Sequence, residues 1–338
     1  MKENKPVKRY KNPSERVNKH AYFFILPFVI GFLVFSLWPM IRSISLSFTN
    51  DNFRNVFGKG ELEPFTIWSN YKFVLGDAEY WHCYFNTIVI FVMNFIPQIV
   101  SALFFAVLFT SRRIRVYGKK VFQFIYFLPN ILTATTVAAL FIILFRFSGE
   151  VDGQPVGGQI YLWLVGMGMD PDFHLLQNAW TVRIIVAFIQ FWMWFGNSMI
   201  VYISGIKAIS NDVFEAAELD GASNFRVFVS ITLPILKPIM LYSLITSIIG
   251  GLQMFDIPYM IIGEQFKSII GTTWPTKTVT IYIYEFMKDN HDYSIASAAS
   301  VILFFFSLII SFVMYFVVFK EKDISKKTWR KINALKRL

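Results

Sequence analysis

The sequence predicts an all-α integral membrane protein with six transmembrane helices, and three observations support this expectation. The chain is 55% hydrophobic and only 16% charged, whereas soluble domains average about 25% charged residues. Six stretches contain no Asp, Glu, Lys or Arg, and each approaches or exceeds the length that crosses a hydrocarbon core of ~30 Å. The formal charge is nevertheless +10, from 32 Lys and Arg against 22 Asp and Glu, which is typical of basic loops between apolar spans.

The uncharged stretches define the expected spans in chain order. They are residues 21–41, 84–111, 121–145, 184–206, 238–255 and 293–319. The fifth is the shortest, because Asp256 interrupts it before residues 257–263 continue the apolar character. Residues 157–169 are too short and too rich in glycine to cross a bilayer, so an interfacial or loop segment is expected there. The first stretch contains Pro27 and Pro39 and lacks a following small-residue cleavage site, so we interpret it as a span and not as a signal peptide.

The distribution of basic residues orients these spans. Lys and Arg number 23 in one set of flanking segments and 8 in the alternate set. The first set is 1–20, 111–120, 206–237 and 320–338, and the second is 49–83, 146–183 and 263–292. Cytoplasmic loops carry the excess of Lys and Arg. The chain is therefore expected to have basic cytoplasmic tails at 1–20 and 320–338 around a transmembrane domain at 21–319. The tails would also attract anionic membrane lipid, and no nucleic-acid partner is expected.

The predicted loop at residues 206–237 differs from the other cytoplasmic segments, because it carries four acidic and three basic residues. Asp212 with Glu215 three positions later is typical of a capping box, so a short helix is expected to start there. Gly221 can end that helix in a left-handed conformation, and Pro234 is expected to discourage further helix. From these residues alone, a docking element for another protein and an amphipathic connector on the membrane both remain open.

Three groups of residues in this loop resemble the EAA loop of binding-protein-dependent ABC importer permeases. They are Glu215-Ala216-Ala217, Asp220-Gly221-Ala222 and Ile231-x-Leu233-Pro234. Three residues separate Ala217 from Gly221 and nine separate Gly221 from Ile231, as in that motif. The longer stretch is similar to the carbohydrate-uptake branch, which includes the maltose and glycerol-phosphate importer permeases. The chain departs from the branch at Ser210, where proline is usual, and after the fifth span, where the common Gly-Gly-Pro is absent.

The resemblance implies a type I ABC importer permease fold with a cytoplasmic coupling helix between transmembrane helices 4 and 5. That helix would dock on a separate ATPase, present in two copies, whose closure on ATP switches the permease from inward- to outward-facing. The residues expected to couple the two chains are Glu215, Ala216, Ala217, Asp220, Gly221, Leu233 and Pro234. Of these, Glu215 would be the charged contact, Ala216 and Ala217 would fill the groove of the ATPase, and Gly221 would allow the turn.

The same resemblance implies further partners and a location. They are a second, related permease chain that forms a heterodimer with this one, and an extracellular or periplasmic solute-binding protein. The location is the cytoplasmic membrane of a bacterium, with both termini in the cytoplasm.

No catalytic site is expected in this chain. It lacks the G-x-x-x-x-G-K-[ST] phosphate loop, so the partner ATPase, and not this subunit, is expected to use ATP and magnesium. A single cysteine, Cys83, and four scattered histidines give no metal-binding spacing. We therefore expect a non-catalytic transport subunit with no cofactor and no metal site of its own.

Polar residues within the spans mark the expected substrate pathway, because such groups are costly in a membrane. The candidates are Asn86, Asn94, Gln98, Gln190, Trp194, Asn197, Gln253 and Asp256. Amides can hydrogen-bond to the hydroxyls of a sugar, and an aromatic ring can stack on its apolar face, so a carbohydrate substrate is expected. Hydrogen bonding between helices explains any single amide equally well.

Two other classes of protein remain alternatives. A stand-alone secondary transporter or channel for small polar solutes usually shows inverted repeats and intramembrane charges, and neither is visible in this sequence. A membrane enzyme acting on a lipid-linked sugar would need an acidic or metal-binding cluster at a membrane face. Co-purification with an ATPase that responds to a binding protein and a sugar would distinguish the importer from both.

Overall fold

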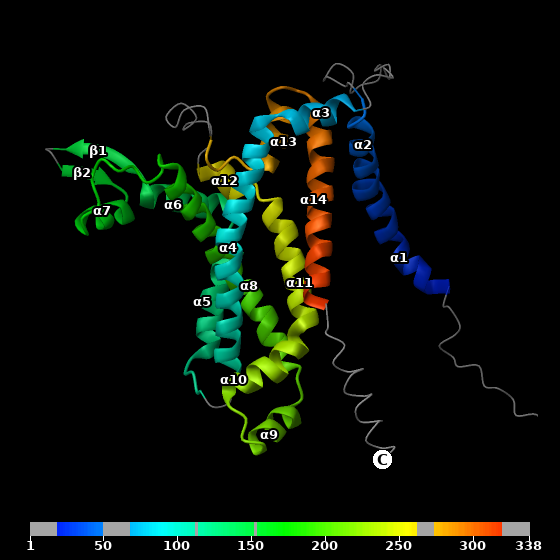
Figure 1. The fold of residues 1–338 in the computed structure, drawn as a ribbon, viewed down its shortest axis with the longest axis vertical. Coiled ribbons are helices and arrows are strands. Elements are labelled where there is room, and N and C mark those ends of the chain that lie inside the picture. Colours follow the sequence, from blue (N-terminus) through cyan, green and yellow to red (C-terminus); the bar gives the residue numbers. More distant parts are fainter. Residues whose placement is uncertain (1–18, 50–67, 112–113, 152–153, 262–273, 320–338) are drawn as a thin grey trace, which may run out of the picture.

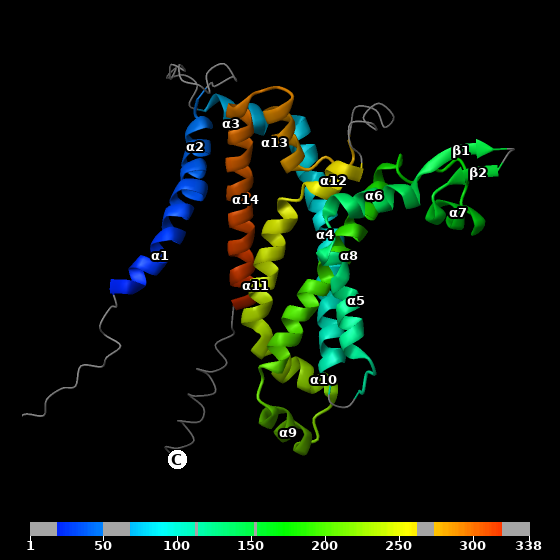
Figure 2. The same cartoon turned by 180° about the vertical axis from the view of Figure 1, so that it is seen from behind.

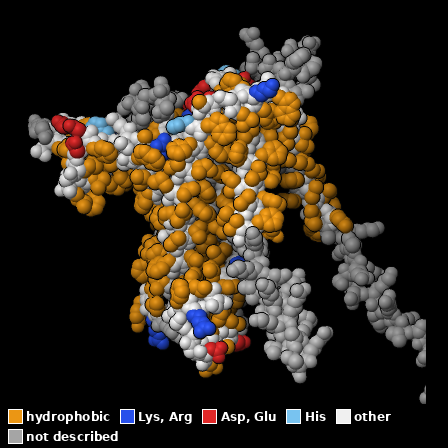
Figure 3. All heavy atoms as spheres, in the orientation of Figure 1, with side chains coloured by type: hydrophobic (Ala, Val, Ile, Leu, Met, Phe, Trp, Pro, Cys, Tyr) orange, Lys and Arg blue, Asp and Glu red, His pale blue; other side chains and the backbone are white. Residues whose placement is uncertain are grey.

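The computed structural model describes residues 19–49, 68–111, 114–151, 154–261 and 274–319. Within them, long apolar helices run between two ends of the molecule (Figure 1), and hydrophobic side chains cover the sides of this bundle (Figure 3). Five helical stretches are long and apolar enough to cross a membrane, or six if one bent pair forms a single span. The predicted helical membrane class is confirmed. Apart from residues 19 and 20, the two basic tails lie outside the described residues.

The first apolar stretch forms a rod whose N-terminal part diverges from the bundle in both ribbon views (Figures 1 and 2), whereas its C-terminal part contacts the last described helix. It consists of α1 (Lys19–Phe32), a π-helical turn η2 (Leu33–Leu37) and α2 (Trp38–Leu46). None of its most apolar window is buried within the chain. At its end, the Asn70 side chain donates hydrogen bonds to the carbonyl oxygens of Ser47 and Thr49. These bonds attach the rod to α3 (Ser69–Gly76), while its apolar surface is left to lipid or to another chain.

The centre of the bundle is built from α4 (Ala78–Thr110) and α8 (Ala179–Lys207), which pack against each other. At the start of each helix, the side chain of the N-cap residue accepts hydrogen bonds from backbone N–H groups of the first turn. Asp77 accepts a hydrogen bond from the backbone of Glu79. Asn178 accepts hydrogen bonds from the backbones of residues 180 and 181.

The third expected span, 121–145, is broken into two helices. It consists of α5 (Lys119–Ile131) and α6 (Ala134–Phe145), which meet at an angle of 96°. Leu132 and Thr133 between them have extended backbones, and Thr133 caps α6 by accepting a hydrogen bond from the backbone of Thr136. The side-chain cap offers the backbone an alternative to helix, which apolar composition does not reveal.

A small antiparallel hairpin departs from the all-α expectation. Strands β1 (Phe147–Val151) and β2 (Gln154–Gly157) pair with Glu150 opposite Pro155. They lead into α7 (Gln159–Gly166), and the three elements project sideways from the bundle (Figure 1). The segment at 157–169 does not form a candidate span, as predicted.

A short helix, α9 (Asn211–Leu219), lies at one end of the bundle, where the sequence predicted a helix. Its start differs from the prediction, because Ser210 and not Asp212 is the N-cap, and the Ser210 hydroxyl accepts from the backbone of Asp212. Ser210 has the extended backbone that an N-cap requires. We call this the α9 end and the opposite end the α13 end.

The chain then re-enters the bundle without a break. Helix α10 (Asn224–Val227), the π-helical turn η4 (Phe228–Thr232) and α11 (Leu233–Leu252) follow one another with helical backbone at every junction. The prediction that Pro234 ends the helix is therefore wrong. Pro234 directly follows the wide π-turn and lies in the first turn of α11 as the chain is divided here. Proline is tolerated best in the first turn of a helix.

Three helices complete the described chain. They are α12 (Asp256–Ile261), α13 (Val279–Lys288) and α14 (Tyr293–Phe319). The last helix has the bounds predicted for the sixth span, and a non-helical step at residues 253–255 separates α11 from α12. Helix α13 was not predicted from the sequence, and it packs against α4 and α14 at the α13 end.

Candidate functional site

A cavity of about 490 Å³ lies among α4, α8, α11 and the start of α12. Its volume is in the range of small-molecule sites, about 300–1,000 Å³. Asn86, one of the eight residues that the sequence nominated for the pathway, lies outside it, and the other seven line it. They are Asn94, Gln98, Gln190, Trp194, Asn197, Gln253 and Asp256. The structure thus brings them together from three separate stretches of the chain, which are α4, α8 and residues 253–256.

Two of these amides make hydrogen bonds within the bundle. Gln98 Nε2 donates to Ser198 Oγ at 2.9 Å, which links α4 to α8. Asn94 Nδ2 donates to the carbonyl oxygen of Ile90 in its own helix, at 3.0 Å. The interhelical role that the sequence left open therefore applies to Gln98, although its side chain also lines the cavity.

The other three amides are available to a ligand. The side chains of Gln190, Asn197 and Gln253 make no hydrogen bond to any residue that the structure describes. Each is at least partly exposed at the cavity wall. Because an amide can donate and accept simultaneously, the three can bind a solute rich in hydroxyl groups.

Helix α11 adds a row of hydroxyl groups that was not nominated from the sequence. They belong to Tyr242, Ser243, Thr246 and Ser247. Their spacing of one, four and five positions places them on one face of a helix, and this pattern could have identified them. Serine and threonine in a membrane span give a weak sequence signal, because their hydroxyls can bond to carbonyls of the preceding turn. Thr246 does so with the carbonyl of Tyr242.

The non-helical step between α11 and α12 lies at the cavity. One of its backbone carbonyl groups accepts hydrogen bonds from a segment that is distant in sequence. The carbonyl oxygen of Met254 accepts hydrogen bonds from Thr278 Oγ1 at 2.9 Å and Thr280 Oγ1 at 2.5 Å. Non-helical backbone in a membrane protein requires partners of this kind. Discontinuous helices often form solute sites in transporters, and here the step brings Gln253 and Asp256 to the cavity wall.

Aromatic rings provide apolar faces beside these polar groups. Trp194 lines the cavity and is 48% exposed. Phe255 also lines it and stacks on Tyr259, with ring centroids 5.0 Å apart and an interplanar angle of 15°. Tyr284 meets both rings edge-on, at 5.1 and 5.5 Å. The cavity wall therefore combines amides, hydroxyls and aromatic faces, which are the groups that bind sugars.

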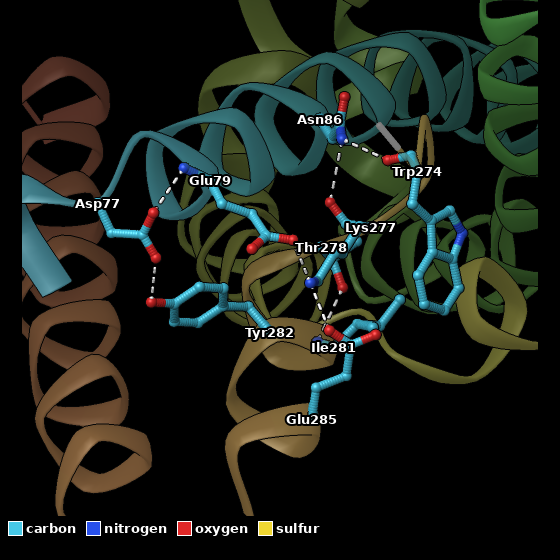
Figure 4. Close-up of polar contacts among 9 residues, drawn as sticks. All are labelled: Asp77, Glu79, Asn86, Trp274, Lys277, Thr278, Ile281, Tyr282 and Glu285. Carbon is cyan, nitrogen blue, oxygen red and sulfur yellow. Dashed lines mark hydrogen bonds and ion pairs between the residues drawn. The ribbon is translucent and has the colours of Figure 1, made fainter. Parts of the chain in front are cut away.

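A buried polar network fixes the α13 end (Figure 4). Asn86 Nδ2 donates to the carbonyl oxygens of Trp274 and Lys277, at 3.3 and 3.1 Å. Arg183 donates to Asn86 Oδ1 and to the carbonyl oxygen of Pro275. Arg183 was predicted to lie in the segment before the fourth span, and this was wrong: it lies within α8 and is only 6% exposed.

Lys277 is the centre of a second part of this network. Its ammonium group lies 2.5 Å from Glu79 Oε1 and also contacts Glu285. Burial lowers the pKa of Lys277, but hydrogen bonds to Glu285 and Glu79 outweigh burial and hold this pKa above its usual value. Nearby, the Tyr282 hydroxyl donates to Asp77 at 2.6 Å. These contacts tie α13 to the start of α4.

The residues nominated for coupling divide into two groups. Glu215, Ala216, Asp220 and Gly221 are exposed on α9 and its following turn. Ala217 is only 6% exposed, so it faces the chain itself and is not available to fill a groove in a partner. The neighbouring Leu219 is 90% exposed.

The other two nominated residues lie apart from α9. Leu233 and Pro234 belong to the first turn of α11. A hollow of about 220 Å³ separates α9 from the ends of α4 and α8, with Phe214 and Glu218 on its wall. The described residues contain no group of three His, Cys, Asp or Glu side chains placed to hold a metal ion.

The turn after α9 requires glycine. Gly221 has φ +70°, and the backbone N–H groups of Gly221 and Ala222 donate to the carbonyls of Glu218 and Ala217, both at 3.0 Å. This pair of bonds is a Schellman motif, in which glycine avoids the strain of the left-handed region. The predicted role of Gly221 as a helix terminator is confirmed.

Comparison with known proteins identifies the family. Residues 86–322 match the family described as binding-protein-dependent transport system inner membrane component, and the chain belongs to it. The resemblance noted in the sequence is thereby confirmed. The chain is 28% identical over 307 residues to the lactose transport system permease protein LacF of Rhizobium radiobacter, covering 90% of this chain and 95% of that one. It is 29% identical over 293 residues to the arabinooligosaccharides transport system permease protein AraP of Bacillus subtilis, covering 86% of each.

Solved structures show the same fold. A crystal structure of a bacterial ABC transporter involved in the import of the acidic polysaccharide alginate contains a similar chain. The TM-score is 0.70 at 21% sequence identity, and the similarity covers 90% of this chain and 96% of that chain. A second structure, of a bacterial alginate ABC transporter in complex with an alginate pentasaccharide-bound periplasmic protein, gives a TM-score of 0.68 at 22% identity over 87% and 92% of the two chains.

Proposed function

We propose that this chain is the permease subunit of an ATP-driven, binding-protein-dependent importer that moves a sugar or oligosaccharide into the cytoplasm. The observation that carries the proposal is the cavity, where unpaired amides, the α11 hydroxyls and aromatic faces meet between spanning helices. The names of its relatives, which transport lactose and arabinooligosaccharides, support a carbohydrate substrate. The alginate transporter in complex with a periplasmic protein supports a solute-binding protein as partner.

The proposed topology has six spans in the cytoplasmic membrane, with α5 and α6 forming one broken span. The α9 end faces the cytoplasm, and both termini lie on that side. The excess of Lys and Arg in the segments of this side supports the orientation. A cysteine introduced at residue 326 should be labelled from outside only after the cells are permeabilised.

We further propose that α9 is the coupling helix. Glu215, Ala216 and Asp220 would contact one of two ATPase subunits, which bind ATP and magnesium, and Gly221 would shape the turn. Helices α10, η4 and α11 are continuous, so a movement of α9 would reach the cavity-lining face of α11. Alternating access would follow from this movement, with a second, related permease chain forming the other half of a heterodimer.

Reconstitution tests the proposed function. The chain is purified with its partner permease and ATPase, placed in liposomes, and supplied with the binding protein and radiolabelled neutral oligosaccharides. We expect ATP-dependent uptake that Asn197→Leu reduces at least tenfold, because that substitution removes an unpaired amide of the cavity. Asn290→Ala, on the exposed surface at the α13 end, should leave uptake unchanged. Uptake by this chain alone, driven by a proton or sodium gradient, would instead identify a secondary transporter.

A further inference from the structure

The charge of the cavity wall is informative about the class of sugar. Among the described residues that line the cavity, Asp256 is the single charged side chain, and no Lys, Arg or His lies among them. The remaining polar groups are amides and hydroxyls, which are neutral. The described part of the cavity wall therefore carries one negative charge and no positive charge.

The Asp256 carboxylate has no counterion among the residues that the structure describes. It is the first residue of α12, its side chain is exposed at the cavity, and it makes no ion pair or hydrogen bond with any residue that the structure describes. Two buried cations at this end, Lys277 and Arg183, already have partners. Lys277 pairs with Glu79 and Glu285, and Arg183 binds Asn86 and the carbonyl of Pro275.

A free carboxylate has opposite effects on neutral and acidic sugars. Its two oxygens accept hydrogen bonds from neighbouring hydroxyl groups of a neutral sugar. A carboxylate on the ligand would instead meet a like charge at close range, and no cation among the described residues of this wall would compensate for it. Such a repulsive group discriminates between two otherwise similar ligands.

We infer that this site selects uncharged oligosaccharides over those that carry uronic acids, and that Asp256 is the specificity-determining residue. The inference rests on the proposed function and adds to it the charge class of the substrate. It also gives Asp256 two tasks, which are to accept sugar hydroxyls and to exclude anionic sugars.

The test measures binding by the assembled permease–ATPase complex in nanodiscs. The complex is titrated, without binding protein, with a panel of neutral trisaccharides and with the same sugars oxidised to a uronic acid at the terminal residue. The readout is the ratio of the two dissociation constants, uronate over neutral, for each pair. We expect a ratio of at least 10 in the wild type, a fall toward 1 in Asp256→Asn, and retention of the wild-type ratio in Asp256→Glu.

A matched control removes a carboxylate outside the cavity. Asp289 is exposed at the end of α13, and Asp289→Asn should leave the ratio unchanged. A wild-type ratio near or below 1 would overturn the inference, and so would an unchanged ratio in Asp256→Asn. Should Asp256→Asn fail to assemble, Gln253→Glu adds a second carboxylate to the same wall and should raise the ratio; an unchanged ratio there contradicts the inference. Failure of every neutral sugar to bind would contradict the proposed function instead.

Discussion

Arg183 on α8 donates two hydrogen bonds to Oδ1 of Asn86 on α4, from Nε at 3.1 Å and from Nη2 at 2.8 Å. The amide nitrogen of the same Asn86 donates to the carbonyls of Trp274 and Lys277. One asparagine therefore joins two central helices to the segment that precedes α13. The guanidinium has no carboxylate partner among the described residues, so its charge is stabilised by these neutral acceptors.

Replacement of Asn86 should destabilise the α13 end. In Asn86→Ala the Arg183 guanidinium loses an acceptor while it stays buried, and two backbone carbonyls lose a donor, which should cost about 3 kcal/mol. The measurement is the thermal unfolding midpoint of the purified complex, followed by tryptophan fluorescence. Asn290→Ala, which removes an exposed amide at the same end, should not move the midpoint. An effect of Asn86→Ala as small as that of the control would show that the network does not stabilise the fold.

Lys277 should make stability depend on alkaline pH. Its pKa in the folded chain lies above the usual 10.5, so its contribution is fully present below that pH and is lost as the pH rises through the folded pKa. We expect the unfolding midpoint to fall above about pH 10.5 in the wild type. In Lys277→Met the two glutamates lose their cation, so the variant should be less stable at neutral pH, and its alkaline fall should be smaller. Parallel pH profiles of the two proteins would contradict this assignment.

Gly221 should be required for coupling and not for membrane insertion. A side chain at φ +70° costs roughly 1–2 kcal/mol in most residues and less in asparagine. No atom of this chain lies within 4 Å of the position that an added Cβ would occupy, so within the chain only backbone strain opposes a side chain there. We expect Gly221→Asp to reach the membrane in normal amount but to hydrolyse ATP without uptake, while Gly221→Asn retains partial uptake. Immunoblots of membranes, ATPase rates and sugar uptake are the measurements, and normal uptake in Gly221→Asp would exclude the docking role.

Uncharged runs in the sequence locate the spanning helices well, because the cost of a charge in lipid applies to every span alike. The same criterion fails where a charge is buried with partners. Arg183 was assigned to a loop for this reason, and its partners Asn86 and Pro275 lie 97 and 92 positions away in sequence. The angle between α5 and α6 could not be predicted, because composition reports how apolar a segment is and not its direction.

The candidate site was more predictable than the network around it. Asn94, Gln98 and the other nominated residues were selected because polar groups are costly within membrane spans and tend to mark functional sites. The cavity that seven of the eight line is such a candidate site. The hydroxyl groups of α11 were missed because a hydroxyl in a membrane helix can bond to its own backbone, as Thr246 does, and so gives a weak sequence signal. Ala217 was placed on the docking face by its motif, whereas burial against the chain depends on how α9 packs, which sequence spacing alone does not determine.

Gly196 should be essential for packing α5 against α8. A Cβ at this position would lie 1.9 Å from the carbonyl oxygen of Tyr126, and a backbone atom within a helix cannot move aside as a side chain can. We therefore expect Gly196→Ala to displace α5 and to lower stability by about 1–3 kcal/mol, measured as a fall in the thermal unfolding midpoint. Gly250 is the matched control, because it also lies within a spanning helix but has no atom within 4 Å of the added Cβ. Gly250→Ala should leave the midpoint unchanged or raise it slightly, since alanine has a higher helix propensity than glycine. Equal losses of stability in the two variants would mean that the close approach of α5 is not the reason why residue 196 must be glycine.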